Sequence, residues 1–328
     1  MKADELKRLR DALGRLTANQ RKLVLHELAH AQAIDEVADC IEKRLAARPM
    51  CPACNGEHVV RNGFANGLQR YKCRNCRITF NALTGTPLAR LRYRDKWLDQ
   101  AKVLDEGLSV RKAATRLGVH STTAFRWRHR WLACPREAKA VHMAGVVEAD
   151  ETYQLLSYKG QPARLARQTQ RAPRRRGGKA AKRGVSSEQV PILVMRNRSG
   201  ETSDFVLPNT GKAALKAVLP QALADDSVLC SDGSNHLHQA AVELAIEHQA
   251  INMSAGERIR GPWHVQNVNA YHSRLKTWLR RFNGISTHYL PNYLGWFRAL
   301  DRNARLRVDA VSLLALAIGP GPSALNAN

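Results

Sequence analysis

The sequence predicts an α/β domain preceded by three smaller parts: a helical segment, a cysteine-rich module and a pair of short helices joined by a tight turn. From about residue 145 onwards, apolar runs typical of strands alternate with amphipathic stretches typical of helices. Before them, four of the seven cysteines fall into two C-x2-C pairs. Between residues 94 and 132, small apolar residues and a turn glycine separate two helical patterns.

The length and charge narrow the class of protein. A chain of 328 residues is long enough for about two domains with small modules beside them. Its formal charge is +24, with 52 Lys and Arg against 28 acids, which favours a polyanionic partner. A membrane surface is the alternative partner, and a ribosome-associated protein would carry a similar charge. No apolar run reaches the roughly 18 residues of a spanning helix, and the charged start MKADELKRLRDALG is not a signal peptide. We expect a cytoplasmic, nucleoid-associated bacterial protein that acts on nucleic acid without a membrane.

Residues 1–48 form the expected helical segment. An apolar stripe recurs at steps of three and four, and Thr17 with Gln20 fits a capping box at the start of a helix. We expect a helical bundle that orders the N-terminus or dimerises. The stripe consists of Ile34, Val37, Ala38, Ile41 and Leu45.

Residues 49–82 form the expected cysteine module. Two C-x2-C knuckles can supply four thiolates in a tetrahedron, which is the geometry of a closed structural Zn2+ site. The glycines and the alternating run 69-QRYKC-73 between the knuckles suit a small hairpin, and zinc replaces the core that so short a segment cannot build. Chance pairs and a redox motif are the alternatives. The predicted ligands are Cys51, Cys54, Cys73 and Cys76.

Residues 90–135 are expected to form a DNA-binding helix-turn-helix, with a plain helical hairpin as the alternative. A first helix stops at Gly107, Ser109 can cap the next helix, and Gly118 makes the tight turn. The last helix, 121-STTAFRWRHRWL-132, begins with a Ser that can cap it, and it is basic. Its candidate DNA contacts are Arg126, Arg128 and Arg130.

Residues 143–302 are expected to form the α/β domain, followed by a C-terminal segment and tail at 303–328. A basic insert at 158–188 has a loop-like composition, and Arg174, Arg175 and Arg176 are expected to clamp phosphates; a merely solubilising loop is the alternative. Runs at 145–149, 190–197 and 202–208 predict a three-stranded antiparallel sheet, with the insert between its first two strands.

Two carboxylates are expected at strand ends of this domain. Asp150 follows the strand at 145–149, and Asp232 follows a run at 227–231 that comes after a predicted helix at 211–223. Glu148 shares the side of Asp150 and is expected near the site or on the surface, whereas Glu151 is expected to point away. Another helix is expected at 235–246.

A later helix, 264–282, is expected to face these carboxylates. Asn269 and Lys276 are seven residues apart and therefore share one face. Two Mg2+ or Mn2+ ions can activate the nucleophile and stabilise the leaving oxygen in phosphodiester cleavage, and Mg2+ prefers hard oxygen ligands such as Asp150 and Asp232. His264, His272 and His288 are expected to be core or surface residues.

The order of these motifs resembles a known family. Cysteine knuckles and a helix-turn-helix are followed by 148-EADETY-153, 231-SDGS-234, 264-HVQNVNAYHSRLK-276 and 291-PNYLGWFR-298. This order is similar to the zinc-ribbon group of bacterial insertion-sequence transposases, which have an RNase H-like DDE catalytic domain. The resemblance covers roughly residues 49–300.

The resemblance implies DNA transposition: strand cleavage at the ends of a mobile element, then attack of the freed 3′-hydroxyl on target DNA. It assigns Asp150 and Asp232 as the first two catalytic acids, Asn269 at the position that usually carries Glu, and Lys276 as a phosphate-binding residue. Asn267 is the alternative third residue. The expected partners are the terminal inverted repeats, target DNA and further copies of the chain. A catalytically inactive, domesticated DNA-binding regulator and a structure-specific nuclease are the alternative functions.

Overall fold

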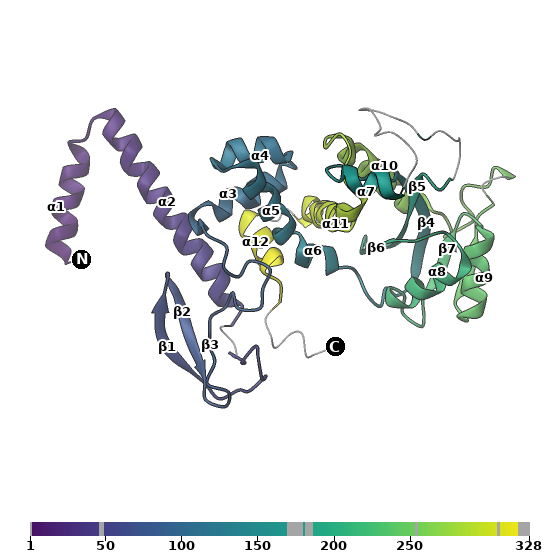
Figure 1. Cartoon of the computed structure of the whole chain (residues 1–328), viewed down its shortest axis with the longest axis horizontal. Helices are drawn as coiled ribbons and strands as arrows, with labels where there is room; N and C mark the ends of the chain where they lie inside the picture. The colour runs from purple at the N-terminus through teal and green to yellow at the C-terminus, as the bar shows by residue number, and fades with distance from the viewer. Residues whose placement is uncertain are drawn as a thin grey trace. The chain divides into compact units, whose positions relative to one another are not determined.

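The computed structural model describes residues 2–45, 49–168, 180, 186–252, 255–306 and 309–320, and its elements are labelled in Figure 1. The chain divides into two compact units. The first consists of Met1–Leu108, Ala113–Ala124 and Asp309–Asn328, and the second of Ser109–Lys112 and Phe125–Val308.

The first unit begins with two helices and continues into a small three-stranded sheet. The predicted capping box is confirmed, because the Gln20 amide donates to Thr17 Oγ1 and the Thr17 amide donates to the Gln20 side chain at 2.9 Å. These elements are α1 (Ala3–Gly14), α2 (Ala18–Lys43), β1 (Val59–Ala65), β2 (Leu68–Cys73) and β3 (Thr79–Phe80).

The predicted hairpin of the cysteine module is confirmed. Strands β1 and β2 pair antiparallel, and β3 adds to β2. Asn66 and Gly67 join β1 to β2 with φ angles of 51° and 72°. Two adjacent residues in the left-handed region make the kind of two-residue turn that matches the strand twist, and Asn-Gly is its favoured sequence.

The predicted short helices between residues 94 and 132 are also present. They are η1 (Arg94–Lys96), α3 (Trp97–Asp105), α4 (Val110–Leu117) and α5 (Ser121–Trp131). The Lys112 amide donates to Ser109 Oγ at 3.4 Å, and Gly118 has the positive φ of 60° that its turn requires. One expectation was wrong. Ser121 already belongs to α5, and it is His120 Nδ1 that accepts the Thr122 amide at 3.3 Å.

A helix near the C-terminus completes the first unit. Helix α12 (Ala310–Ile318) packs against α2 and α3, and Cys40 Sγ lies 3.7 Å from the carbonyl oxygen of Val311. Leu314 on α12 is fully buried. This helix was not predicted, because a short apolar run does not reveal which distant surface it covers.

The second unit contains a five-stranded mixed sheet, so the predicted α/β class is confirmed. Its strands are β4 (Val146–Leu155), β5 (Gln189–Asn197), β6 (Thr202–Val206), β7 (Val228–Ser231) and β8 (Glu247–Ala250). Its helices are α6 (Ala133–Glu137), α7 (Pro162–Gln168), α8 (Lys212–Val218), η2 (Leu219–Gln221), α9 (Asn235–Glu243), α10 (Gln266–Arg280), η4 (Thr287–Tyr289) and α11 (Leu290–Leu306).

The strand order across the sheet is β6-β5-β4-β7-β8. Strands β4, β5 and β6 pair antiparallel, as predicted, whereas β7 and β8 run parallel to β4. The predicted end of the first strand was wrong, because β4 continues through Asp150 to Leu155 by pairing with β5. The short strand β8 was not predicted, since its sequence EHQA has no alternation of apolar residues.

Different helices cover the two faces of this sheet (Figure 1). Helices α8 and α9 cover one face with an apolar core that includes Val147 and Ala149 of β4. Helices α10 and α11 contact the other face. There, Arg196 of β5 forms a buried ion pair with Asp301 of α11 at 2.9 Å. A charge at such a depth is tolerated only when it is paired.

The basic insert is described in part. Its first portion contains α7, with Leu165 buried, and is therefore not the loop that its composition predicted. Arg174, Arg175 and Arg176 lie outside the described residues. Among the helices that the structure describes, none is long and apolar enough to cross a membrane.

Candidate functional site

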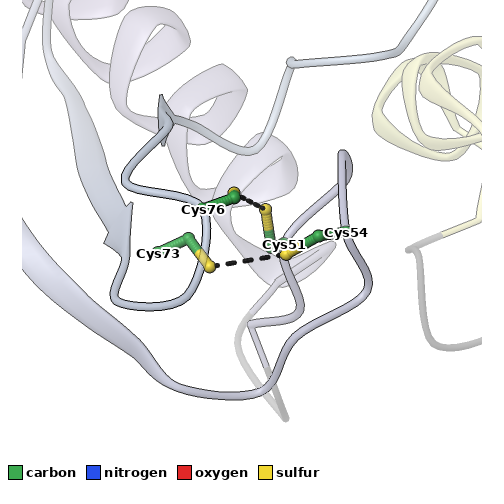
Figure 2. Close-up of side chains that lie close together, drawn as sticks. All are labelled: Cys51, Cys54, Cys73 and Cys76. Carbon is green, nitrogen blue, oxygen red and sulfur yellow. Dashed lines mark hydrogen bonds between the residues drawn. The ribbon is translucent and has the colours of Figure 1, made fainter.

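The four cysteines of the two knuckles come together in the first unit (Figure 2). Cys51 Sγ lies 3.5 Å from Cys76 Sγ, and Cys54 Sγ lies 3.6 Å from Cys73 Sγ. Four sulfurs at about 2.3 Å from one tetrahedral Zn2+ ion lie roughly 3.8 Å apart. The predicted ligand set therefore has the spacing of a closed zinc site.

The pKa values within this cluster shift in opposite directions, because that of Cys73 is lowered while those of Cys54 and Cys76 are raised. The hydrogen bond from the Cys76 amide lowers the pKa of the Cys73 thiol to about 7, against the opposing effect of burial. A thiol with a lowered pKa gives up its proton readily and ligates as thiolate. Because Cys73 ends β2 and Cys76 follows in the next turn, the strand pairing itself brings this amide to the sulfur.

The arginines of α5 do not share one environment. Arg126 is exposed and Arg130 is half-buried, and the Arg126 charge contributes to lowering the pKa of Arg130 after burial, so the two lie near each other. The expectation that Arg128 contacts DNA was wrong for this structure. Arg128 is 1% exposed, and its guanidinium lies 4.9 Å from the ring centre of Trp296. Residues two apart on a helix face different directions, which separates Arg128 from the other two.

In the second unit, the carboxylates of Asp150, Glu151 and Asp232 gather within 4.8 Å of one another. The parallel pairing of β4 and β7 explains the meeting of the two aspartates. Glu148 of β4 lies opposite Cys230 of β7, so two residues further along each chain Asp150 comes level with Asp232. Such a group of hard oxygen donors can hold a Mg2+ or Mn2+ ion.

Glu151 does not point away, contrary to expectation. Its carboxylate belongs to the cluster, and burial followed by the charges of Asp150 and Asp232 raises its pKa to about 7. Burial and the Asp150 charge likewise raise the pKa of Asp232. Strand β7 ends at Ser231, so no strand lies beside β4 on that side beyond this residue. Side chains from both faces of β4 can therefore approach the Asp232 carboxylate.

Glu148 is fully buried and holds the start of α10. Its carboxylate accepts hydrogen bonds from the Val268 amide at 2.9 Å and from Asn267 Nδ2 at 2.8 Å, and it pairs with Arg198. His264 Nδ1 also lies 3.4 Å from it. Glu148 thus satisfies a free amide at the helix N-terminus and fixes α10 against β4.

Helix α10 presents Asn269, His272 and Lys276 on one face, since they are three and four residues apart. Asn269 is half-buried, whereas Lys276 is exposed. Among the described residues, no hydrogen bond joins either side chain to the aspartates. His272, expected to be a core or surface residue, is buried with Nδ1 3.5 Å from Asp150 Oδ2.

Glu151 is thus a member of the acidic cluster that was not expected there, whereas His272 is buried, as a core histidine would be. Glu151 was set aside because strand alternation points it away from Asp150, and His272 because a single histidine on a helix carries no signal. The i, i+3 spacing of His272 from Asn269 was the available clue.

Two parts of this chain match known protein families. Residues 142–298 match the ISXO2-like transposase domain, and residues 90–138 match a homeodomain-like domain of the helix-turn-helix type. The chain is 29% identical over 255 residues to a Halobacterium salinarum protein described as an uncharacterized protein in transposable element ISH50. That similarity covers 76% of this chain and 83% of the relative. The resemblance of the motifs to insertion-sequence transposases is confirmed.

Proposed function

We propose that this chain, whose residues 142–298 belong to the family of ISXO2-like transposase domains, binds insertion-sequence ends and catalyses metal-dependent DNA strand cleavage and strand transfer. The observation that supports this most directly is the carboxylate cluster of Asp150, Glu151 and Asp232 inside that domain. A domain of this family with an intact acidic cluster retains the donor set for phosphoryl transfer.

The fold of the catalytic domain is proposed to be RNase H-like. In support, three antiparallel strands are followed by two parallel ones, and the two aspartates belong to the adjacent strands β4 and β7. The sheet thereby holds both carboxylates on a rigid frame, as a catalytic site requires.

Asp150, Asp232 and Glu151 would hold Mg2+ or Mn2+. Bound divalent ions would polarise the scissile phosphate and lower the pKa of an attacking water or hydroxyl. The chain itself would orient the site, since Glu148 fixes α10 and His272 of that helix lies against Asp150, with Asn269 on the same helix face. Lys276, which is exposed on the same helix face, would bind a phosphate of the DNA backbone.

DNA recognition is proposed for α5 of the helix-turn-helix. Arg126 is exposed and Arg130 lies one turn away, so they can contact phosphates or base edges together. The cysteine module is proposed to carry structural Zn2+. Its two-residue turn and short strands supply few buried apolar side chains, so a metal would hold it together.

Self-association is proposed to involve the N-terminal helices. Helix α1 has no buried residue, and its leucines at positions 6, 9 and 13 are 55%, 47% and 37% exposed. A 12-residue helix that buries nothing is only marginally stable in water. A second copy of the chain that covers this stripe supplies the missing packing.

Strand nicking and joining on labelled DNA that carries the element's own ends tests the proposed reaction. The reaction is run with Mg2+, with EDTA and with the Asp232→Asn variant. Joining that requires the metal and disappears in the variant supports transposition. Cleavage without joining favours the alternative of a structure-specific nuclease.

Tight, specific binding without any cleavage in Mg2+ or Mn2+ favours the inactive regulator. The presence of Asn269 where a third acid is expected motivates that alternative. The three clustered carboxylates argue against it, because a protein that no longer cleaves DNA has no need to keep them together.

A further inference from the structure

His272 is the side chain of α10 that the structure brings against the acidic cluster. Its Nδ1 lies 3.5 Å from Asp150 Oδ2, and its side chain is 6% exposed. The other ring nitrogen, Nε2, is buried and has no hydrogen-bond partner among the described residues. A histidine so deeply buried normally has its nitrogens satisfied, and Nδ1 is the nitrogen that faces the acidic cluster.

A direct hydrogen bond does not explain the arrangement. N–H···O bonds have heavy-atom distances of about 2.7–3.2 Å, and the His272–Asp150 separation of 3.5 Å is longer. Two donors that each lie about 2.1 Å from a shared ion are roughly 3.0 Å apart in octahedral geometry and roughly 3.4 Å apart in tetrahedral geometry. The observed separation of 3.5 Å is wider than the octahedral value and close to the tetrahedral one, and a small closing movement would bring both donors to one cation.

Asp150 has an oxygen free to serve such a cation. Its Oδ1 accepts the Glu151 amide at 2.8 Å, whereas Oδ2 is the atom next to His272. The same residue belongs to the cluster with Glu151 and Asp232, which does not include His272. Asp150 is therefore shared by two donor sets, and in two-metal sites a shared carboxylate joins the two ions.

We propose that His272, through Nδ1, is a ligand of the divalent ion that Asp150 shares with α10. This inference rests on the proposed function, since it extends the same metal site. Asn269, one turn earlier on the same helix face, would be a further donor or a water ligand. An imidazole is a softer donor than a carboxylate, so an ion with this ligand would be a transition metal such as Mn2+ in preference to Mg2+.

The first test is pulsed electron paramagnetic resonance of the full-length protein with Mn2+ bound. A coordinated imidazole gives a 14N modulation of the Mn2+ echo, and we expect it in the wild type. His272→Gln should bind Mn2+ at least about tenfold more weakly and lose the modulation. Labelling all histidines with 15N should replace the 14N pattern without changing any contact.

Matched histidine variants make the test specific. His264→Gln removes a histidine beside Glu148, and His248→Gln removes one of a pair that meets through Nδ1 atoms at 3.1 Å. Both variants should keep the 14N modulation. Loss of the modulation in His248→Gln rather than in His272→Gln would overturn the proposal, as would bound Mn2+ without any nitrogen coupling. Circular dichroism and thermal unfolding confirm that each variant is folded.

Different results would contradict the proposed reaction and the proposed His272 ligand. If Asp232-dependent joining occurs but Mn2+ shows no nitrogen coupling, the transposase stands and the His272 ligand does not. If the coupling is present and depends on His272 but no strand is cut, the ligand stands and the proposed reaction does not. If the folded protein binds no Mn2+, the His272 proposal is overturned regardless of the cleavage result.

Discussion

Glu148 has a structural role, anchoring α10, that its position two residues before Asp150 does not reveal. Its carboxylate is fully buried, accepts a hydrogen bond from the Val268 amide at the start of α10, and pairs with Arg198. Removing one partner of a buried charge pair typically destabilises a protein by about 3–5 kcal/mol. We expect Glu148→Ala to lower the free energy of unfolding by about that amount, as measured by urea denaturation of the full chain.

Glu247 is the matched control for this prediction. It is an exposed glutamate on the edge strand β8, so Glu247→Ala should change the free energy of unfolding by less than about 0.5 kcal/mol. Equal stability of the two variants would show that Glu148 does not anchor α10.

Arg126 and Arg128 lie on the same helix, and variants of them distinguish a contribution to DNA binding from a contribution to packing. Arg126→Ala should weaken binding to the element ends by about 1 kcal/mol or more and reduce the salt slope by about one, because an exposed charge is lost. Arg128→Ala should instead destabilise the protein by about 3 kcal/mol, because it empties the space beside Trp296. Fluorescence anisotropy and denaturation measure the two effects. Weaker binding in folded Arg128→Ala, with Arg126→Ala unchanged, would reverse the assignment.

His129 makes the stability of the second unit depend on pH. Burial, followed by the charges of Arg128 and His288, lowers its pKa from 6.5 to about 4. Between those values the unfolded chain binds a proton that the folded chain does not, so stability falls as the pH drops from about 6.5 to about 4. The contribution of one group is at most about 1.4 kcal/mol per pH unit.

His129→Gln isolates that contribution. Denaturation at pH 7, 6 and 5 should show a smaller loss of stability in this variant than in the wild type. The exposed His236 is the control, and His236→Gln should retain the wild-type slope. Identical slopes in all three proteins would mean that His129 is protonated as easily in the folded chain as in the unfolded one.

At the scale of elements, helices and strands with strong local patterns were predictable. The Thr17 cap, the Asn66–Gly67 turn and the antiparallel β4–β6 strands each have a local sequence cause. The short β8 and the helix α12 were not predicted, since an edge strand and a returning helix form through distant partners. Glu151 joined the cluster for a similar reason, because the end of β7 is a tertiary feature.

The cysteine module should depend on its metal as a whole element. Cys51 is fully buried and lies 3.5 Å from Cys76, so Cys51→Ser removes one of four clustered donors. We expect zinc content, measured by elemental mass spectrometry, to fall from about one ion per chain, and the hairpin to unfold. Cys230→Ser, a buried cysteine outside the cluster, should leave the zinc content unchanged. Retention of zinc in Cys51→Ser would rule out the four-thiolate site.

At the scale of the whole molecule, the N-terminal helices determine whether the chain acts alone. The exposed leucines of α1 continue into α2, where Leu23, Leu25 and Leu28 are 63%, 65% and 59% exposed. The buried residues of α2 lie in its second half, at Val37, Cys40 and Ile41. Apolar side chains gathered on two successive helices are typical of a surface that another chain covers.

The prediction is a dimer or larger assembly that depends on this stripe. Burying leucine side chains contributes about 1.5–3 kcal/mol each, so replacing Leu6, Leu9 and Leu13 with Ser removes several kcal/mol of association free energy. Light scattering should show a multimer for the wild type and a monomer for the triple variant, with unchanged zinc content. A variant with Lys7→Ser and Arg8→Ser keeps the leucines and should remain associated. If the triple variant keeps the assembly mass of the wild type, self-association uses another surface. DNA joining by a monomeric triple variant would show that a single copy completes the reaction.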